Sequence, residues 1–159
     1  MYTDKAKTRA TNNAYALLRQ RPRSEFEIRD RLKIKGYGEE VIESVVEGLR
    51  RAGEIDDARF AKLWVDERMR LNPAGDVVLR HELKTKGLSA QLIEAVLDEK
   101  NKNYDEYEIA FGMAGDRFER LKKLDRKKAL KRLYDFLLRR GFKYDTVQKV
   151  VENIINANG

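Results

Sequence analysis

The sequence contains no cysteine, only two prolines and one histidine among its 159 residues. Without cysteine the chain can form neither a disulfide bond nor a thiolate metal site, and a reducing cytoplasm is the simplest setting for it. Because His81 is the one histidine, a metal site built on several histidines is excluded. No apolar run approaches the roughly 20 residues that a membrane-spanning helix needs, and the first residues show no apolar signal segment. We therefore expect a cytoplasmic protein that does not enter the membrane.

Motifs for catalysis and nucleotide binding are missing too. There is no Gly-x-x-x-x-Gly-Lys-Ser/Thr loop, and the pair Gly112 and Gly115 does not follow a predicted strand. The adjacent acids Asp56 and Asp57 suit helix N-caps better than a metal site, because neighbouring side chains at a helix start rarely converge. We expect a protein that is not an enzyme and that uses no cofactor or metal.

The sequence is rich in charged residues and in apolar residues at helical spacing. Charged residues make up 38% of the chain, hydrophobic residues make up 42%, and the formal net charge is +7. A chain with this much apolar sequence can bury a core, which a disordered chain cannot. The composition is therefore typical of a soluble, helix-rich protein.

A fifteen-residue unit occurs three times. In each copy a leucine stands four residues before a glycine, an apolar residue follows the glycine, and aliphatic residues lie six, nine and ten positions after it. The glycines are spaced 51 and 54 residues apart, so three units account for nearly the whole chain. Self-similarity at such a period indicates a repeat protein. The copies are Leu32–Val46, Leu83–Leu97 and Leu137–Val151.

Each unit predicts two helices joined by a tight turn. A helix that passes Leu32 ends at Gly36, because glycine adopts the left-handed conformation at little cost. In the helix that follows, Ile42, Val45 and Val46 lie at i, i+3 and i+4 and form one apolar face. A further helix before each unit completes a three-helix repeat.

We therefore predict an all-α fold of three tandem three-helix repeats in an elongated, curved array. Residues 1–10 are polar and basic, and we expect them to form a flexible N-terminus. The predicted repeats cover residues 11–53, 54–101 and 102–159. Gly112 and Gly115 lie inside the first helix of the third repeat, where each glycine costs about 1 kcal/mol relative to alanine.

The residues of these units resemble those of a known family. The matching segments are Ser24-x-x-Glu27-Ile-Arg29-x-x-Leu32-x-x-Lys35-Gly36-Tyr37, Ile55-Asp56-Asp57-x-Arg59-Phe60-Ala61, Glu82-Leu83-x-x-Lys86-Gly87-Leu88 and Arg140-Gly141-Phe142. Together they resemble the RecX family, the regulators of the bacterial RecA recombinase. The acidic pair followed by Arg-Phe-Ala is the most specific part. The resemblance covers roughly residues 13–155, and the long basic stretch of the third repeat departs from it.

The resemblance implies a partner and an action. It implies a non-enzymatic regulator that binds the RecA–single-stranded DNA filament and restrains filament assembly, ATP hydrolysis and strand exchange. Such a protein acts in homologous recombination, DNA repair and the SOS response, and contacts single-stranded DNA through the filament. We expect a monomer.

Basic residues are concentrated in the third repeat. From Arg117 to Lys143 there are twelve lysines or arginines and three acids, an excess larger than the net charge of the whole chain. Such asymmetry predicts contact with DNA phosphate or with an acidic protein surface, and a merely solvated basic face is the other interpretation. The candidate binding residues here are Arg120, Lys123, Lys127, Lys128, Lys131, Arg132, Arg139 and Arg140.

The repeat itself supplies a second set of candidates. Lys35 and Lys86, like Arg140, stand one residue before the glycine, and Arg29 and Arg80 stand three residues before the leucine. A cation in the last turn of a helix interacts favourably with the helix dipole by about 0.3–1 kcal/mol, which accounts for Lys35, Lys86 and Arg140 without any partner. Binding would require them to align along one face of the array.

Direct DNA binding by helix-turn-helix-like modules is the alternative function. Two helices joined at Gly36 could present a recognition helix to a groove. The helix after Gly36 begins with Glu39, Glu40 and Glu43, however, and acids at a helix start suit a DNA groove poorly. The pattern therefore favours a filament regulator over a direct DNA binder.

Overall fold

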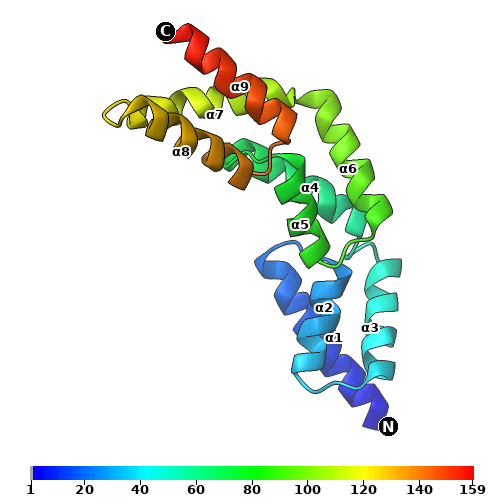
Figure 1. Cartoon of the computed structure of the whole chain (residues 1–159). Coiled ribbons are helices and arrows are strands. Elements are labelled where there is room, and N and C mark those ends of the chain that lie inside the picture. The colour runs from blue at the N-terminus through cyan, green and yellow to red at the C-terminus, as the bar shows by residue number, and fades with distance from the viewer. Residues whose placement is uncertain (1) are drawn as a thin grey trace. The chain divides into compact units, whose positions relative to one another are not determined.

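The computed structural model describes residues 2–159, and these form nine α-helices and no strand (Figure 1). Consecutive helices group in threes along the chain, which confirms the predicted all-α fold of three tandem three-helix repeats. The first repeat contains α1–α3, the second α4–α6 and the third α7–α9. The helices are α1 (Tyr2–Gln20), α2 (Glu25–Ile34), α3 (Glu39–Arg51), α4 (Asp57–Leu71), α5 (Asp76–Thr85), α6 (Ala90–Asn103), α7 (Glu106–Leu121), α8 (Arg126–Arg139) and α9 (Tyr144–Ala157).

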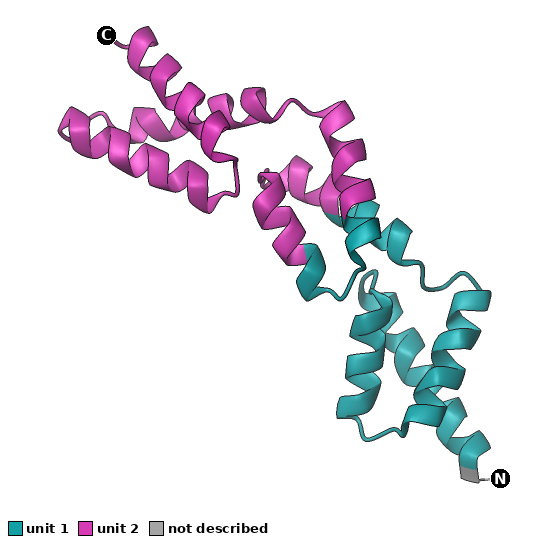
Figure 2. Cartoon of the chain, turned by 45° about the vertical axis from the view of Figure 1, so that its right-hand side comes forward, with its two compact units in different colours: residues 1–64, 83–93 teal, residues 65–82, 94–159 magenta. Residues whose placement is uncertain are grey.

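The chain divides into two compact units, shown in Figure 2. Unit 1 comprises residues 1–64 and 83–93, and unit 2 comprises residues 65–82 and 94–159. The helices of the first repeat therefore belong to unit 1 and those of the third repeat to unit 2. The residues of the second repeat are divided between the two.

The three repeat glycines end the middle helix of each repeat, as predicted. Their φ angles are +90° at Gly36, +77° at Gly87 and +89° at Gly141. The N–H group of the next residue donates to the carbonyl of the repeat leucine, at 3.2 Å for Tyr37 to Leu32. The equivalent bonds measure 3.2 Å from Leu88 to Leu83 and 3.3 Å from Phe142 to Leu137. This pattern is the Schellman motif, and it explains the spacing of leucine, glycine and apolar residue in the sequence.

The core of the first repeat reaches further toward the N-terminus than predicted. Helix α1 begins at Tyr2, in place of the flexible segment expected over residues 1–10; Met1 lies outside the described residues. Ala10 and Ala14 are fully buried on the helix, and Asp4 in its first turn suits the helix dipole. They pack with the buried side chains Ile28, Leu32, Ile42, Val45, Val46, Leu49 and Ile55.

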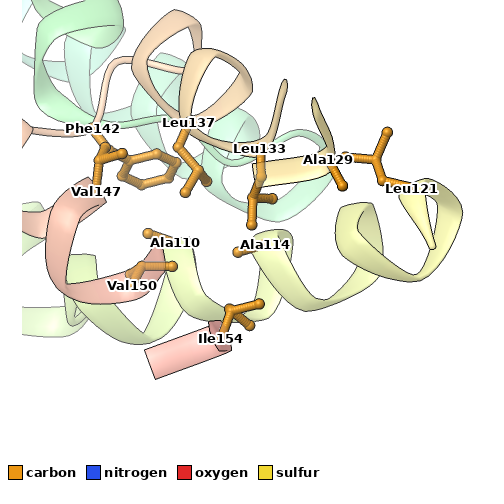
Figure 3. Close-up of a cluster of buried hydrophobic side chains, with 10 residues drawn as sticks. All are labelled: Ala110, Ala114, Leu121, Ala129, Leu133, Leu137, Phe142, Val147, Val150 and Ile154. Carbon is orange, nitrogen blue, oxygen red and sulfur yellow. The ribbon is translucent and has the colours of Figure 1, made fainter. Parts of the chain in front are cut away.

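The core of the third repeat lies between α7, α8 and α9 (Figure 3). Two small residues on α7, Ala110 and Ala114, are fully buried and let the neighbouring helices approach closely. Helix α7 runs unbroken through Gly112 and Gly115, so tertiary packing outweighs their low helix propensity. On α8 the buried stripe is Ala129, Leu133 and Leu137, while Leu130 is only half-buried.

An acid in the first turn of α5 is buried. The carboxylate of Asp76 accepts hydrogen bonds from Lys100 Nζ and, at 2.9 Å, from Asn101 Nδ2. The two charged residues are 4% and 5% exposed. Burial alone would raise the pKa of Asp76, but the hydrogen bonds from Lys100 and Asn101 outweigh it and hold the pKa below its ordinary value. A buried ion pair therefore joins α5 to α6 within unit 2.

Candidate partner-binding surfaces

The third-repeat basic surface comprises seven exposed cations at the end of α7, in the turn after it and on α8. Within residues 2–159 none of the seven side chains makes an ion pair or a hydrogen bond. Six of them were predicted as binding residues, and Arg126, at the first position of α8, was not in that set. The surface comprises Arg120, Lys123, Arg126, Lys127, Lys128, Arg132 and Arg139.

The geometry of α8 explains why these cations face outward. Its buried residues are spaced four apart, so one stripe of the helix faces the core and the basic positions lie on the remaining surface. Asp125 caps the helix by accepting from the N–H of Lys128, and the first turn itself contains no acid. The positive end of the helix dipole thus coincides with Arg126, Lys127 and Lys128, which suits this end of α8 to an anion.

Few acids offset this surface. Lys131 lies 3.8 Å from Asp135, but its side chain is 82% exposed, and so exposed a pair contributes about 0–1 kcal/mol. Lys122 pairs with Glu119 at 2.6 Å. Lys131 therefore remains available to a partner.

Arg29 and Arg80 each join two helices of their own repeat. The Nη1 of Arg29 lies 2.7 Å from Glu43 Oε2, and the Nε of Arg80 lies 2.7 Å from Glu94 Oε1. Each glutamate stands seven residues after the repeat glycine, so the same bond ties the middle helix to the last helix in both repeats. The hydrogen bond that Arg29 donates to Glu43 raises the pKa of Arg29. The third repeat has Tyr134 in place of the arginine, and the pair is absent there.

Lys86 is also engaged inside its unit. Its Nζ lies 3.7 Å from Glu27 Oε2 and 5.0 Å from the centre of the Trp64 ring. The Glu27 side chain is 12% exposed and also pairs with Arg21 and Arg23. Burial alone would raise the pKa of Glu27, but the hydrogen bond from Arg21 and the nearby cations hold it below its ordinary value. Lys86 therefore helps to balance a largely buried carboxylate.

Arg140 has a comparable internal role in unit 2. Its Nη2 donates to Asn72 Oδ1 and, at 2.9 Å, to the carbonyl of Pro73. Its Nε is buried without a hydrogen-bond partner. Burial, and then the charge of Arg68, lower the pKa of Arg140. Of the three cap cations that are equivalent in sequence, only Lys35 has neither an ion pair nor a side-chain hydrogen bond within residues 2–159.

Lys86 and Arg140 stand where the middle helices of successive repeats meet. In unit 1 the hydroxyl of Ser24, which caps α2, donates to the carbonyl of Lys86 at 2.7 Å. Phe26, in the first turn of α2, lies so close to Gly87 that a Cβ there would overlap it. We call this contact of a helix start with the capped end of another middle helix a cap junction.

Unit 2 contains a second cap junction. The N–H of Gly75 donates to the carbonyl of Arg140 at 2.8 Å, and the N–H of Val77 donates to that of Gly141 at 3.2 Å. Val78, in the first turn of α5, lies against Gly141. The sequence shows the glycines that make this contact possible, but not the bonds, since their partners lie more than sixty residues apart.

Within residues 2–159 no three histidine, cysteine, aspartate or glutamate side chains come together as metal ligands. None of the described helices is both long enough and apolar enough to cross a membrane.

Comparison with known proteins gives one consistent result. Family models described as the first, second and third three-helix domains of RecX match residues 10–49, 56–97 and 104–151. The chain is 30% identical over 152 residues to the regulatory protein RecX of Clostridium acetobutylicum, covering 94% of this chain and 70% of that protein. It is 32% identical over 153 residues to the regulatory protein RecX of Prosthecochloris aestuarii, covering 96% and 98%.

Solved structures show the same fold. A crystal structure of regulatory protein RecX superposes with a TM-score of 0.82 at 22% identity, over 95% of this chain and 74% of that chain. The crystal structure of RecX from Lactobacillus salivarius gives a TM-score of 0.81 at 21% identity, over 94% and 97%. The resemblance seen in the repeat residues is thus confirmed along the whole array. The chain belongs to the RecX family of regulatory proteins, built of three tandem three-helix domains.

Proposed function

We propose that this chain is a non-enzymatic regulator that binds the RecA–single-stranded DNA filament and restrains its assembly, ATP hydrolysis and strand exchange. Its membership in a family of regulatory proteins supports a regulatory role. A partner of this kind places the protein in the cytoplasm, in recombination, DNA repair and the SOS response. The DNA strand is contacted as part of the filament.

The third-repeat basic surface is the observation that carries this proposal. Three of its cations on α8 and the neighbouring, exposed Lys131 crowd two turns of one helix without a buried carboxylate to offset them. Like charges at i and i+4 repel by about 0.2–0.5 kcal/mol, and a polyanionic partner relieves that repulsion. The four are Lys127, Lys128, Lys131 and Arg132.

The test replaces these four residues together by glutamine, which keeps the helix because glutamine is a good helix former. A matched control removes four exposed cations of α1 in unit 1 that form no ion pair with any other described residue. Binding of the parent and both variants to recombinase-coated single-stranded DNA is titrated at two salt concentrations. The variants are K127Q/K128Q/K131Q/R132Q and, as control, K5Q/K7Q/R9Q/R19Q.

We expect the α8 variant to bind the filament more weakly and with a flatter dependence on salt, while the α1 control binds like the parent. If both variants restrain the recombinase as the parent does at every salt concentration, the α8 face is only solvated. Naked single-stranded and duplex DNA serve as additional ligands. Equal binding to naked and coated DNA, with a steep salt dependence, would favour a direct DNA binder.

A further inference from the structure

The two cap junctions define what the capped end of a middle helix accepts. In each, a donor at the start of the incoming helix bonds to the carbonyl just before the glycine, from Ser24 in unit 1 and from Gly75 in unit 2. An apolar residue of the first turn, Phe26 or Val78, lies against the glycine. The chain thus makes the same kind of contact twice, with a side-chain donor in unit 1 and a backbone donor in unit 2.

The first repeat has the same capped end without an incoming helix. Nothing lies within 4 Å of the position that a Cβ would take on Gly36. No hydrogen bond within residues 2–159 uses the carbonyl of Lys35, which corresponds to the accepting carbonyls of Lys86 and Arg140. The free end of α2 is therefore a third copy of a surface that is occupied in the other two repeats.

The residues around this end are suited to a partner. Ile34 is 71% exposed, although it belongs to a class of residue that is usually buried. The equivalent positions in the other repeats hold the polar residues Thr85 and Arg139. Arg31 and Lys33 join Lys35 as exposed cations without an ion pair in the described part of the chain. The free end of α2 thus combines an apolar side chain, the open carbonyl of Lys35 and a positive rim.

We propose that the free end of α2 docks the first turn of a helix of the recombinase that carries an acidic and an apolar residue in that turn. The apolar residue lies on Gly36 and Ile34, as Phe26 lies on Gly87. The acid faces Lys35 and Lys33, as Glu27 in α2 faces Lys86 in the unit 1 junction. This inference rests on the proposed function and adds a contact in unit 1, separate from the basic surface of unit 2.

A second copy of this chain fits the site less well. The middle helix whose start enters no cap junction is α8, and its first turn contains Arg126, Lys127 and Lys128 with no acid. Docking that turn on Lys33 and Lys35 would oppose cation to cation, and like charges across an interface disfavour binding. The charges therefore select a foreign, acidic helix start over head-to-tail assembly of the chain with itself.

The first experiment measures binding of the full chain to the recombinase–single-stranded DNA filament. The variant K33E/K35E reverses the rim charge. The variant K5E/K7E makes the same charge change on exposed lysines of α1 that form no ion pair within the described part of the chain. The uncharged variant Ile34→Ser removes the apolar contact without altering the helix dipole. We expect roughly tenfold weaker binding for K33E/K35E and Ile34→Ser, which corresponds to about 1.4 kcal/mol. The affinity of K5E/K7E should stay within about twofold of the parent.

Parental affinity in both K33E/K35E and Ile34→Ser would overturn the inference and leave the proposed function standing. Equal weakening by K5E/K7E would also overturn it, because the effect would then follow net charge. If the parent does not bind the filament at all, the proposed function fails and this inference fails with it.

A second experiment locates the contact. Because the sequence has no cysteine, Ile34→Cys can carry a single photoreactive group, with Leu71→Cys, 62% exposed in unit 2, as the control site. We expect a cross-link from position 34 to the first turn of a recombinase helix that contains aspartate or glutamate. Cross-links only to a second copy, only to other recombinase surfaces, or equally from position 71 would overturn the inference.

Discussion

The first and third repeats share their backbone plan and differ in how they use charge. Both end the middle helix with the same glycine cap, at nearly the same φ angle for Gly36 and Gly141. In the first repeat the arginines are held by carboxylates: Arg29 by Glu25 and Glu43, and Arg50 by Glu25 and Glu47. In the third repeat most cations of α8 have no such partner within residues 2–159. The same backbone plan therefore supports a first repeat whose arginines form internal ion pairs and a third repeat whose cations are mostly exposed to solvent.

The difference shows which cations support the fold. A cation bonded to a carboxylate within its own unit, such as Arg29, is part of the structure even though its sequence position suggested a binding role. A cation without a partner, such as Lys127, adds repulsion to the folded state and gains an interaction only from another molecule. Removing paired cations should therefore lower stability, and removing unpaired ones should not.

The buried pair in unit 2 provides the largest test of this difference. Asp76→Ala leaves Lys100 charged and 5% exposed without its carboxylate, and breaking one side of a buried pair costs about 3–5 kcal/mol. Urea unfolding followed by circular dichroism measures the loss. As control, Asp116→Ala removes an exposed, unpaired acid and should change the unfolding free energy by less than about 0.5 kcal/mol. Equal losses of unfolding free energy in the two variants would mean that the buried pair adds nothing to stability.

The same pair predicts a dependence on pH. The pKa of Asp76 lies below its ordinary value of 3.8 in the folded protein, so the folded state holds its proton less tightly than the unfolded chain does. Its contribution to stability is complete above pH 3.8 and is lost as the pH falls through the folded-state pKa. Unfolding of the parent and of Asp76→Ala, measured from pH 6 downward, should show the difference between them shrinking below about pH 4. If the difference in unfolding free energy between the parent and Asp76→Ala did not change with pH, the lowered pKa of Asp76 would be contradicted.

The cap leucines should behave alike in all repeats. Leu32, Leu83 and Leu137 are each fully buried, and truncation of a buried leucine to alanine costs about 2–5 kcal/mol. Urea unfolding of the three single variants should give losses in that range for the first, second and third repeats. A loss within about 0.5 kcal/mol at any of them would mean that this repeat lacks the shared core, and the comparison of repeats would fail there.

Features that depend on neighbouring residues could be predicted from the sequence, and features that depend on distant ones could not. The caps at Gly36, Gly87 and Gly141 follow from a leucine, a glycine and an apolar residue within six positions. The bond of Asp76 to Lys100 joins residues 24 apart. Local rules assign Asp76 to a cap because they contain no information on what covers it.

The candidate site follows the same rule. Predicting exposed cations on α8 needed only the helical period, and the exposure of Lys127, Lys128 and Arg132 agrees with it. Predicting that Lys86 would lie beside Glu27 needed the cap junction, whose bond from Ser24 to Lys86 joins residues 62 apart. Equivalent sequence positions therefore did not mean equivalent roles, since an end repeat lacks one neighbour.

Alanine substitution of the cap glycines should lower stability by different amounts in the first and third repeats. Gly36→Ala places a side chain at φ +90° in open space, so it should cost only the left-handed strain of about 1–2 kcal/mol. Gly141→Ala adds a clash, because its Cβ would lie 2.5 Å from the backbone nitrogen of Val78. Urea unfolding should therefore show a larger loss for Gly141→Ala. Equal losses would mean that the unit 2 junction opens freely.

The smallest expected effect concerns four exposed cations of α8. The variant K127Q/K128Q/K131Q/R132Q removes the repulsion between residues 127 and 131 and between residues 128 and 132, each worth about 0.2–0.5 kcal/mol. Its unfolding free energy should equal or slightly exceed that of the parent at low salt. Added salt screens the same repulsion, so the parent should gain stability between about 0.01 and 0.3 M salt while the variant gains less. Urea unfolding at the two salt concentrations measures both. A variant clearly less stable than the parent would show that these cations brace the third repeat as Arg29 braces the first, and the contrast between the repeats would be lost.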